Sequence, residues 1–587
     1  MHKILTGFAL FWFIFSFPVT PQDKIPEEWK TRFEKSGFLE SPRYSETMDY
    51  FRKFSEFSPF VRFNSIGVSP QGREINYLIV SKDKCFTPEE AHESGKPILL
   101  IISGIHSGEI EGKDASMLLL REILVTKEKE FYLDSLILLV VPIFSVDGHE
   151  RSSAFSRINQ NGPVEQGWRT TAQNLNLNRD WLKADAPEMQ ALLRLFSVWL
   201  PDLWIDSHTT DGADHQYTLT YGLEKFANVE SGLADFTKNE LIPHIEKYVT
   251  GKGYLVAPYV GFVKESPENG LYDWVGLPRL SNGYGAAQNR ICFLIETHMI
   301  KPYKERVFST KAGMESFLEL LYHRGSYIKK LNNDADGNSR CDYGAQGKWF
   351  PVTFSRTQKS TDFLYKGFET IGEESNISGT KKIKYTNIKK DMTVPFYNDM
   401  AVTDSVKPAK FYFIPEEWES LVKRLELHGV VYKKLTKDTT FRVTRYKFKD
   451  VKLSEVSYEG RQTVTCSYDT FTAVERIPAG TFLIPTNQRA VRVIVHALEP
   501  KSPDSFLRWG FMNSIFERKE YFEWYVMEEV ALKMYNEDPI LRKEFDKRLS
   551  EDEKFRNEPY ARLNFFYERS PYFDKKLNLY PIFRFEF

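Results

Sequence analysis

The chain has 587 residues, of which 42% are hydrophobic and 15% aromatic, so it can bury large cores and should form more than one domain. Its 79 basic and 80 acidic side chains give a formal net charge of −1. This balance excludes a molecule that is polycationic as a whole, as expected of proteins that bind nucleic acid or anionic membranes through bulk charge. Small or peptidic partners are favoured instead.

The N-terminus has the pattern of a secretory signal peptide. Lys3 is followed by an uncharged apolar stretch from Ile4 to Val19 and then by polar sequence. We therefore expect residues 1–20 to be a signal peptide and the mature protein to be exported to the periplasm, the medium or the cell surface. An uncleaved membrane anchor is the alternative, because an apolar stretch of this length nearly spans a bilayer.

From about residue 44 to 325, apolar runs alternate with segments of helical periodicity. Helical periodicity is clearest in GKDASMLLLREIL and APEMQALLRLFSVWL. The apolar runs are short and bounded by polar or turn residues, as expected of strands buried on both faces: INYLIVS, PILLIIS, SLILLVVPI, DLWIDSH and ICFLIETH. The alternation predicts an α/β layered domain, which we assign to residues 21–328.

The composition changes beyond this region. Residues 329–345 are polar and turn-rich and are interpreted as a linker. Residues 346–500 contain short alternating stretches, such as FRVTRYKFKD, TFLIP and AVRVIVHAL, and one amphipathic helix in PEEWESLVKRLELHG. They predict a small β-rich accessory domain. Residues 501–587 are helical in pattern and dense in aromatics, and we expect this region to pack against the rest of the chain.

His106 and Glu109 follow the second apolar run, in the stretch SGIHSGEIEGKD. A catalytic zinc ion needs about three imidazole or carboxylate ligands and one open position. Two such residues, three positions apart in a turn, can converge on one ion, and the small Ser107 and Gly108 allow the turn to close tightly. Taken alone, the pair is equally consistent with a surface turn that enters a helix.

Two further strand ends supply the remaining groups. WIDSHTTDG places His208 at the end of one apolar strand, and ICFLIETHM places Glu296 at the end of another. Because the carboxyl edge of an α/β sheet presents such residues together, His208 can be a third ligand and Glu296 a general acid and base. The alternatives are a core histidine and a carboxylate that pairs with Lys301 or Arg306.

Basic and amide side chains between these strands fit the same chemistry. Arg157, in SRINQNG, can stabilise the oxyanion that forms when a carbonyl is attacked. Asn178 and Arg179 are neighbours in NLNLNRDW. A guanidinium group with an adjacent amide matches a substrate carboxylate.

Taken in order, these motifs resemble the zinc carboxypeptidases, or metallocarboxypeptidases, over roughly residues 40–325, beginning at SPQGREI. The resemblance implies a bacterial-type exported member with extra C-terminal regions, and a three-layer fold with a mixed, mostly parallel sheet of about eight strands. It also implies one Zn²⁺ per chain with three ligands, a general acid/base, a carbonyl-polarising arginine and a pair that holds the substrate carboxylate. By this resemblance the zinc ligands are His106, Glu109 and His208, and Glu296 is the general acid/base. Arg157 is the carbonyl-polarising arginine, and Asn178 with Arg179 holds the substrate carboxylate.

The chain departs from the family pattern in several places. Gly108 stands where digestive members carry an arginine, so contacts with substrate on that side should differ. Asn176 replaces the aspartate that orients a zinc-binding histidine, and its amide oxygen can still accept the ring N–H. The mobile tyrosine that covers bound substrate is assigned to Tyr284, in NGYGAAQNR, with Tyr272 as the alternative.

Three functions are compatible with these residues. The leading hypothesis is a zinc-dependent metallocarboxypeptidase that removes C-terminal residues from peptides, with Arg179 selecting a free carboxylate. The second keeps the metal chemistry in a deacylase or amidase that acts on N-acyl amino acids or cell-wall peptides. The third, a binding protein with an inactive catalytic domain, predicts that a ligand or the acid/base residue is missing, and all four are present. We expect a peptide or acylated amino-acid substrate, no nucleic acid, and no integral membrane segment once the signal is removed.

Overall fold

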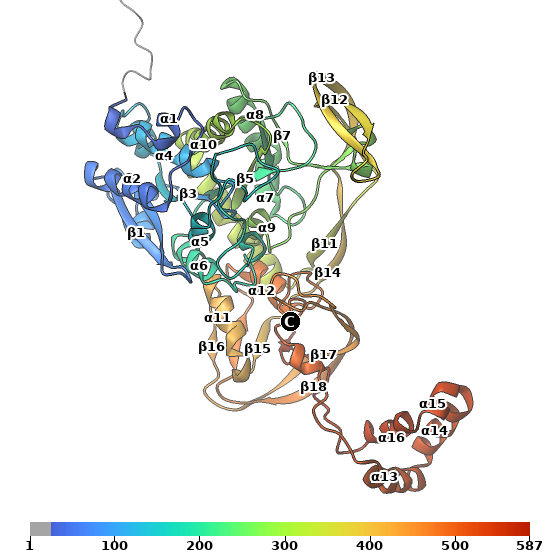
Figure 1. Cartoon of the computed structure of the whole chain (residues 1–587). Helices are drawn as coiled ribbons and strands as arrows, with labels where there is room; N and C mark the ends of the chain where they lie inside the picture. The colour runs from blue at the N-terminus through green and yellow to red at the C-terminus, as the bar shows by residue number, and fades with distance from the viewer. Residues whose placement is uncertain (1–24, 587) are drawn as a thin grey trace, which may run out of the picture.

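The computed structural model describes residues 25–586, and an eight-stranded sheet organises the N-terminal half of the chain (Figure 1). The signal peptide expected at residues 1–20 lies outside the described residues. The strands, in sheet order, are β1 (Val61–Val68), β2 (Glu74–Val80), β4 (Ile137–Val141), β3 (Ile98–Ser103), β5 (Leu203–Thr210), β10 (Ile291–His298), β6 (Leu219–Gly222) and β7 (Val256–Pro258). Pairing is parallel from β4 through β3 and β5 to β10 and between β6 and β7, and antiparallel elsewhere. The predicted mixed, mostly parallel sheet is confirmed.

Alternate side chains of each central strand enter two different cores. On β3, Leu99 and Ile101 belong to one apolar cluster, whereas Leu100 and Ile102 belong to the other. This alternation follows from the two-residue period of a strand, and it requires helices on both faces. Helices α2 (Tyr44–Phe57), α4 (Glu111–Leu124), α8 (Ile242–Gly251) and α10 (Tyr303–Ser339) cover the first face, and α6 (Pro187–Trp199) covers the second. The result is the expected three-layer arrangement. Shorter helices complete this half: α1 (Arg32–Lys35), α3 (Pro88–Glu93), α5 (Val146–Glu150), α7 (Ser231–Phe236) and α9 (Ser281–Ala287).

The segment interpreted as a linker is helical. Helix α10 continues to Ser339, and the wider turns of η8 (Arg340–Ala345) follow it directly. The polar residues of this segment bind the catalytic half. The Asn332 amide donates to the backbone and side chain of Asp202 (2.9 and 3.1 Å), and Arg290 pairs with Asp336 (3.0 Å). The interpretation was wrong because this polarity serves tertiary contacts and not solvation.

Residues 346–500 are rich in strands, as expected. Strands β11 (Phe350–Arg356) and β14 (Met400–Val406) pair with each other. The long hairpin of β12 (Thr361–Glu374) and β13 (Lys381–Tyr397) joins β9 (Leu271–Tyr272) and β8 (Gly261–Phe262) of the catalytic half in a four-stranded sheet. A six-stranded sheet contains, in order, β16 (Lys433–Lys434), β19 (Phe482–Pro485), β15 (Phe411–Ile414), β20 (Phe583–Phe585), β17 (Thr439–Leu453) and β18 (Val464–Ile477).

Two helices lie in the same region, one as predicted and one against prediction. Helix α11 (Glu419–Leu427) buries Leu421, Val422 and Leu425, the apolar face read from the sequence. The stretch AVRVIVHAL was interpreted as β-type, but it forms helix α12 (Val491–Leu498). All of its residues are buried, so an apolar run without alternation is compatible with either structure, and tertiary packing outweighs the β-propensity of its valines.

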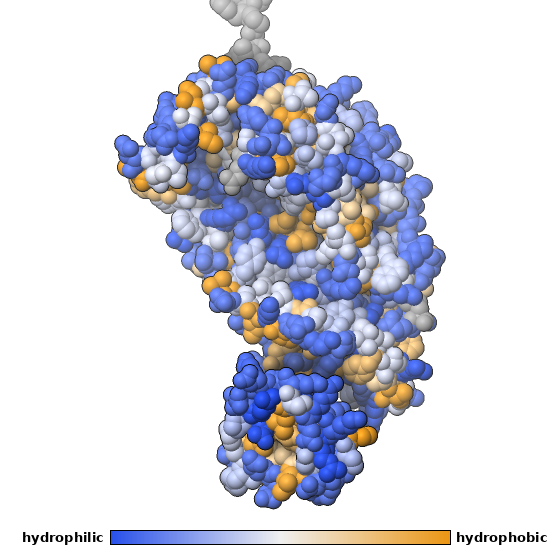
Figure 2. Space-filling model, turned by 90° about the vertical axis from the view of Figure 1, so that its right-hand side faces the viewer, coloured by the Kyte–Doolittle hydropathy of each residue, from blue (hydrophilic) through white to orange (hydrophobic). Residues whose placement is uncertain are grey.

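The C-terminal helices form a separate cluster. Helices α13 (Trp524–Glu537), α14 (Pro539–Glu551), α15 (Glu553–Asn557) and α16 (Pro559–Tyr567) share an apolar core made from residues 522–573 alone. Figure 1 shows this lobe apart from the body, and in Figure 2 it forms the lower end of the molecule. The expectation that residues 501–587 pack against the rest of the chain was wrong for these helices, whereas Phe506, Met512 and Tyr580 share an apolar core with the β-rich region. Within the described residues, no helix combines the length and apolarity that crossing a membrane requires.

Candidate active site

The sequence-predicted residues meet at the carboxyl edge of the central strands. His106 and Glu109 lie in the tight turn between β3 and α4, which the hydrogen bond from the Glu109 N–H to the His106 carbonyl closes (2.9 Å). Gly108 is required there, because a Cβ would lie 2.1 Å from the Arg157 side chain and 2.8 Å from the Gly167 carbonyl. On the neighbouring parallel strands β5 and β10, His208 and Glu296 are directly opposite each other.

Three of these side chains form a compact and buried set of candidate metal ligands. One ligand atom each from His106, Glu109 and His208 lies within 4.8 Å of the others. The Nδ1 atom of His106 is 3.1 Å from one Glu109 oxygen, and the Nδ1 atom of His208 is 2.9 Å from the other. Two imidazoles and a carboxylate that converge in this way match the donor set of a catalytic zinc site.

The outer nitrogen of each imidazole has an oxygen partner. The Nε2 atom of His106 is 2.9 Å from the amide oxygen of Asn176, and that of His208 is 2.8 Å from a carboxylate oxygen of Asp206. Partners of this kind fix the ring orientation and the tautomer, so the Nδ1 atoms are free to bind an ion. Asn176 performs the orienting contact expected of it. Asp206 was missed by the sequence reasoning, although its spacing of two from His208 places both on the same face of β5.

The side chains around Glu109 hold it ionised. Burial alone would raise the pKa of this carboxyl, but His106 and Arg157 outweigh it and hold the pKa well below its usual range. Burial likewise lowers the pKa of His106, which favours the neutral imidazole that a metal needs. Burial also opposes the charged form of His208, but Asp206 and Glu109 prevail and its pKa lies well above the usual value.

Glu296 is a carboxylate without a partner beside this set. Within the described part of the chain it makes no side-chain hydrogen bond or ion pair, since Lys301 pairs with Asp214 (3.0 Å) and Arg306 with Glu111 (2.5 Å). The alternative in which Glu296 merely pairs with one of these cations is therefore wrong. Burial, together with the charges of Glu109 and Asp206, raises the pKa of Glu296 to about 8 against the opposing effect of His208. A carboxyl with a pKa near neutrality is suited to exchanging protons.

Two arginines flank Glu109. The Nη2 atom of Arg157 lies 2.9 Å from a Glu109 oxygen, and the Nη1 atom of Arg169 lies 3.2 Å from the same oxygen. Arg157 is thus at the site, as the sequence indicated. Arg169, in the stretch GWRTT, carries no motif that would have distinguished it from other basic residues.

Asn178 and Arg179 occupy the short turn η4 (Leu177–Arg179) next to His208. The Asn178 amide lies 3.3 Å from the Nε2 atom of His208, and its oxygen accepts the backbone N–H of Ser281 (3.0 Å). Arg179 is half-buried and donates to the Asn178 carbonyl (2.7 Å). No acidic side chain among residues 25–586 pairs with Arg179, so its remaining N–H groups can bind an anion.

Tyr284 does not reach the site. Its side chain is fully buried and stacked on Trp181, its hydroxyl lies 3.0 Å from the Nδ1 atom of His428, and it accepts from Gln288 (2.7 Å). The assignment of Tyr284 as the substrate-covering tyrosine was wrong, because its sequence position inside a helix allowed no judgement of burial. Tyr272, the alternative, packs against Gly261 and under Arg356.

A different tyrosine lies near the cluster. Burial raises the pKa of Tyr259 to about 12, and the next contribution comes from the charge of Glu296. The Tyr259 hydroxyl interacts with Thr210, two residues beyond His208 on β5. A Coulombic effect of that kind requires proximity, so Tyr259 stands at the edge of the site.

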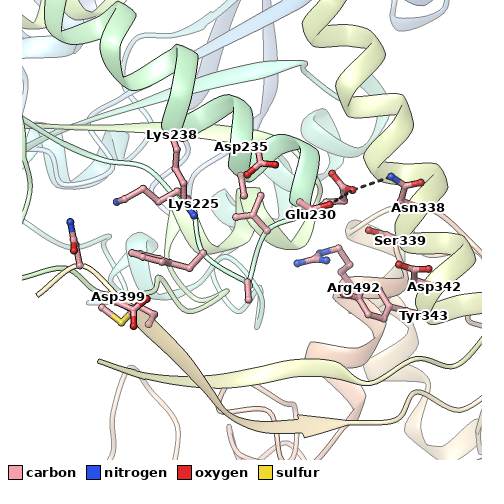
Figure 3. Close-up of a pocket in the computed structure, with 17 residues that line it drawn as sticks. Lys225, Glu230, Asp235, Lys238, Asn338, Ser339, Asp342, Tyr343, Asp399 and Arg492 are labelled. Carbon is pink, nitrogen blue, oxygen red and sulfur yellow. Dashed lines mark hydrogen bonds between the residues drawn. The ribbon is translucent and has the colours of Figure 1, made fainter. Parts of the chain in front are cut away.

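A larger cleft lies elsewhere and contains none of these residues. It has a volume of about 610 Å³ and lies between α7, the end of α10 and α12, where acidic and basic side chains such as Asp235, Lys238 and Arg492 alternate (Figure 3). Its wall is partly closed by the hydrogen bond from Asn338 to Glu230 (3.0 Å). No member of the metal-ligand set lines this cleft, so it is not the substrate site of that centre.

Part of the chain is similar to known proteins. Residues 47–287 match the family model of the zinc carboxypeptidases. Carboxypeptidase 2 of Trichophyton rubrum is 24% identical over 496 residues, which cover 80% of this chain and 84% of that protein. A probable carboxypeptidase 2 of Arthroderma benhamiae is 24% identical and covers 79% of this chain and 85% of its own. A metallo-carboxypeptidase structure from Pseudomonas aeruginosa superposes with a TM-score of 0.36 at 18% identity, over 48% of this chain and 69% of that one.

The α/β fold carries two histidines and a glutamate at its sheet edge, which is the donor set of a catalytic zinc site. Residues 47–287 are similar to the zinc carboxypeptidases, the family that the sequence motifs resemble.

Proposed function

We propose that the protein is an exported, zinc-dependent carboxypeptidase that removes C-terminal residues from peptides. The proposal rests on the buried set of His106, Glu109 and His208. Arg179, whose guanidinium pairs with no described acidic side chain, follows Asn178, whose amide lies 3.3 Å from the Nε2 atom of His208. In this proposal residues 21–328 form the catalytic domain, and residues 346–500 form an accessory domain. Export rests on the signal-like pattern of residues 1–20.

The residues present fit a zinc ion. His106 Nδ1 is a buried polar atom without a hydrogen bond, and it faces Glu109 in the company of the His208 Nδ1 atom. A buried and unsatisfied nitrogen is costly unless something binds it. Bound here, zinc would supply Lewis acidity that polarises a substrate carbonyl and makes water more acidic.

The substrate carboxylate is assigned to Arg179 and Asn178. A guanidinium fork binds a carboxylate in a bidentate manner, which fixes the position of the chain end and therefore of the last peptide bond. Arg157, whose Nη2 atom lies 2.9 Å from a Glu109 oxygen, is assigned to donate N–H groups to negative charge that develops on the scissile carbonyl oxygen. These positions select peptides with a free C-terminus.

Glu296 is assigned as the group that moves protons. Its raised pKa and its lack of any other partner allow it to accept a proton from the attacking water and to deliver that proton to the leaving amine. Neither role requires a movement of β10, because Glu296 is opposite His208 in the parallel pair.

The test is the hydrolysis of paired peptides that differ only in whether the C-terminus is a free carboxylate or an amide. Wild type should cleave the free-acid peptide and leave the amidated one intact. Glu296→Gln should bind zinc normally and lose activity by at least about 10³-fold, and Arg179→Met should raise KM for the free acid. Cleavage of N-acyl amino acids with no cleavage of either peptide would instead support a deacylase, and equal cleavage of both peptides would contradict the role of Arg179.

A further inference from the structure

The accessory hairpin of β12 and β13 returns to the catalytic half and contacts the loop that follows the third candidate ligand. A bridge pairs His215 with Gly367 of β12, and the Gln216 N–H donates to the Lys366 carbonyl (2.9 Å). The Tyr217 hydroxyl donates to the Leu364 carbonyl (3.1 Å) and accepts the Lys366 N–H (3.0 Å). Phe396 of β13 pairs with Leu271 of β9. The hairpin is therefore hydrogen-bonded into the catalytic half along both of its strands.

A pocket lies between this hairpin and the metal-ligand set. It has a volume of about 210 Å³, and its lining includes Thr210 at the end of β5 and Thr220 of β6. Thr210 is two residues beyond His208, and the Thr220 hydroxyl donates to the Glu296 carbonyl (3.0 Å). Tyr259, whose pKa the charge of Glu296 raises, lines the same pocket. These contacts place the pocket next to the reacting centre.

The outer wall of the pocket comes from the hairpin. Phe363 and Tyr365 of β12 line it, together with Phe262 and Tyr217 from the catalytic half. The Tyr365 ring lies 5.9 Å from that of Phe262 and 6.1 Å from that of Tyr217, so the two regions form one aromatic cluster. Without residues 363 and 365 the pocket would be open on this side.

The chemistry of the lining defines what the pocket binds. Among the described residues, no lysine or arginine lines it, and its one acidic side chain, Asp211, is exposed to solvent. The volume is below the range of pockets that enclose a whole small-molecule ligand, which begins at about 300 Å³, and it suits a single side chain. An aromatic or large aliphatic side chain would bury its surface against the five Phe and Tyr rings of the lining.

We propose that the accessory hairpin, through Phe363 and Tyr365, completes the substrate pocket and makes the enzyme select an aromatic or large apolar residue next to the cleaved bond. This inference rests on the proposed carboxypeptidase activity. It gives the β-rich region a direct role in specificity, since two residues more than 150 positions beyond His208 (363 − 208 = 155) close the site that His208 helps to build.

The test compares kcat/KM over two peptide series, one varied at the C-terminal residue and the other at the residue before it, each with Phe, Leu, Ala and Lys. In one of the two series, wild type should prefer Phe and Leu over Ala by about tenfold or more. Phe363→Ala should reduce that preference to within about threefold. Phe363→Leu should give an intermediate preference.

Leu364→Ala is the matched control. Leu364 is the neighbour of Phe363 on β12, but its side chain is 53% exposed and does not line the pocket, so selectivity should stay at the wild-type value. Zinc content and Tm, measured for each variant, separate a change in selectivity from a loss of fold. If Phe363→Ala fails to fold, Phe363→Leu carries the comparison.

The outcomes distinguish this inference from the proposed function. If wild type prefers apolar residues and the Phe363 variants keep that preference, or lose activity equally on all peptides, the hairpin does not set specificity. If wild type cleaves none of the peptides, the carboxypeptidase proposal fails and this inference with it.

Discussion

At the scale of single residues, the site depends on which nitrogen of each histidine is already engaged. Asn176 and Asp206 bind the Nε2 atoms of His106 and His208, and both Nδ1 atoms then face Glu109. Neither histidine could present its other nitrogen without breaking a buried hydrogen bond, which costs about 1–3 kcal/mol. The orienting residues therefore contribute to the metal affinity although they do not touch the ion.

Replacement of Asn176 by leucine should weaken zinc binding by about ten- to a hundredfold, because His106 loses the acceptor that fixes its ring. Competition with a calibrated chelator measures this change. Gln173→Leu, an exposed position in the same loop, is the control and should bind zinc like wild type. Equal affinity of the Asn176 variant and wild type would show that Asn176 does not orient the histidine.

Glu188 gives the fold a pH dependence that is independent of the metal site. Both of its carboxyl oxygens are buried without a hydrogen-bond partner, and burial, followed by the charge of Asp147, raises its pKa to about 7. Because this folded-state value lies above the usual 4.5, the protonated form favours folding. Its stabilisation is complete below about pH 4.5 and is lost as the pH rises through about 7.

Glu188→Gln should therefore stabilise the protein at pH 8 by roughly 2 kcal/mol, and much less at pH 5, since the amide cannot ionise. Thermal or denaturant unfolding at the two pH values measures the difference. Glu56→Gln, at an exposed position, should leave the pH dependence of wild type unchanged. A Glu188 variant whose stability parallels that of wild type across this range would contradict the assignment.

The sequence was sufficient for the ligand set but not for the residues that surround it. His106, Glu109, His208 and Glu296 stand at or just after apolar strands, and parallel strands bring their ends to one edge. The role of Tyr284 could not be judged in the same way. Its burial depends on Trp181 and on His428, which come from distant parts of the chain.

At the scale of elements, the strands could be predicted from the sequence, whereas some of the helices could not. Apolar runs identified all five predicted strands, because burial on both faces leaves a local signal. Helix α12 and the end of α10 left no such signal. The first is buried on all sides, Arg492 and His496 included, and the second is polar because it binds Asp202 and Asn289 across the fold.

The extension of α10 can be tested with two adjacent asparagines. Asn332 is fully buried and donates twice to Asp202, whereas Asn333 is exposed. Asn332→Ala should reduce stability by about 1–3 kcal/mol, because it leaves the Asp202 carbonyl and carboxylate without these donors. Asn333→Ala should change stability by less than about 0.5 kcal/mol. Equal effects of the two substitutions in chemical denaturation would instead indicate that residues 329–345 are a flexible linker.

At the scale of the whole molecule, the parts of the chain contribute unequally to the candidate site. The catalytic half carries the ligand set, and the β-rich region contributes a hairpin to the adjacent pocket. The loop between β17 and β18 adds Glu459, whose carboxylate accepts the Asn176 N–H (3.1 Å). The helical lobe of α13–α16 makes no such contribution, because no hydrogen bond or ion pair of residues 524–567 reaches any described residue before Arg518.

The helical lobe should therefore be removable. The Asn578 N–H donates to the Ile515 carbonyl (2.8 Å), so the segments that precede and follow the lobe already lie together. A chain in which a short Gly-Ser linker replaces residues 520–573 should keep its zinc and retain kcat/KM within about twofold of wild type. Loss of metal or of soluble protein on this excision would show that the lobe supports the rest of the fold.

The central claim is that one zinc ion lies between His106, Glu109 and His208, and anomalous diffraction at the zinc absorption edge tests it most directly. We predict a single strong peak about 2.0–2.2 Å from the Nδ1 atoms of both histidines and from a Glu109 oxygen. The peak should vanish in His208→Ala crystals grown under the same conditions. A peak on the Nε2 side of either ring, a zinc ion bound elsewhere, or no zinc at this set in the wild-type protein would contradict the account.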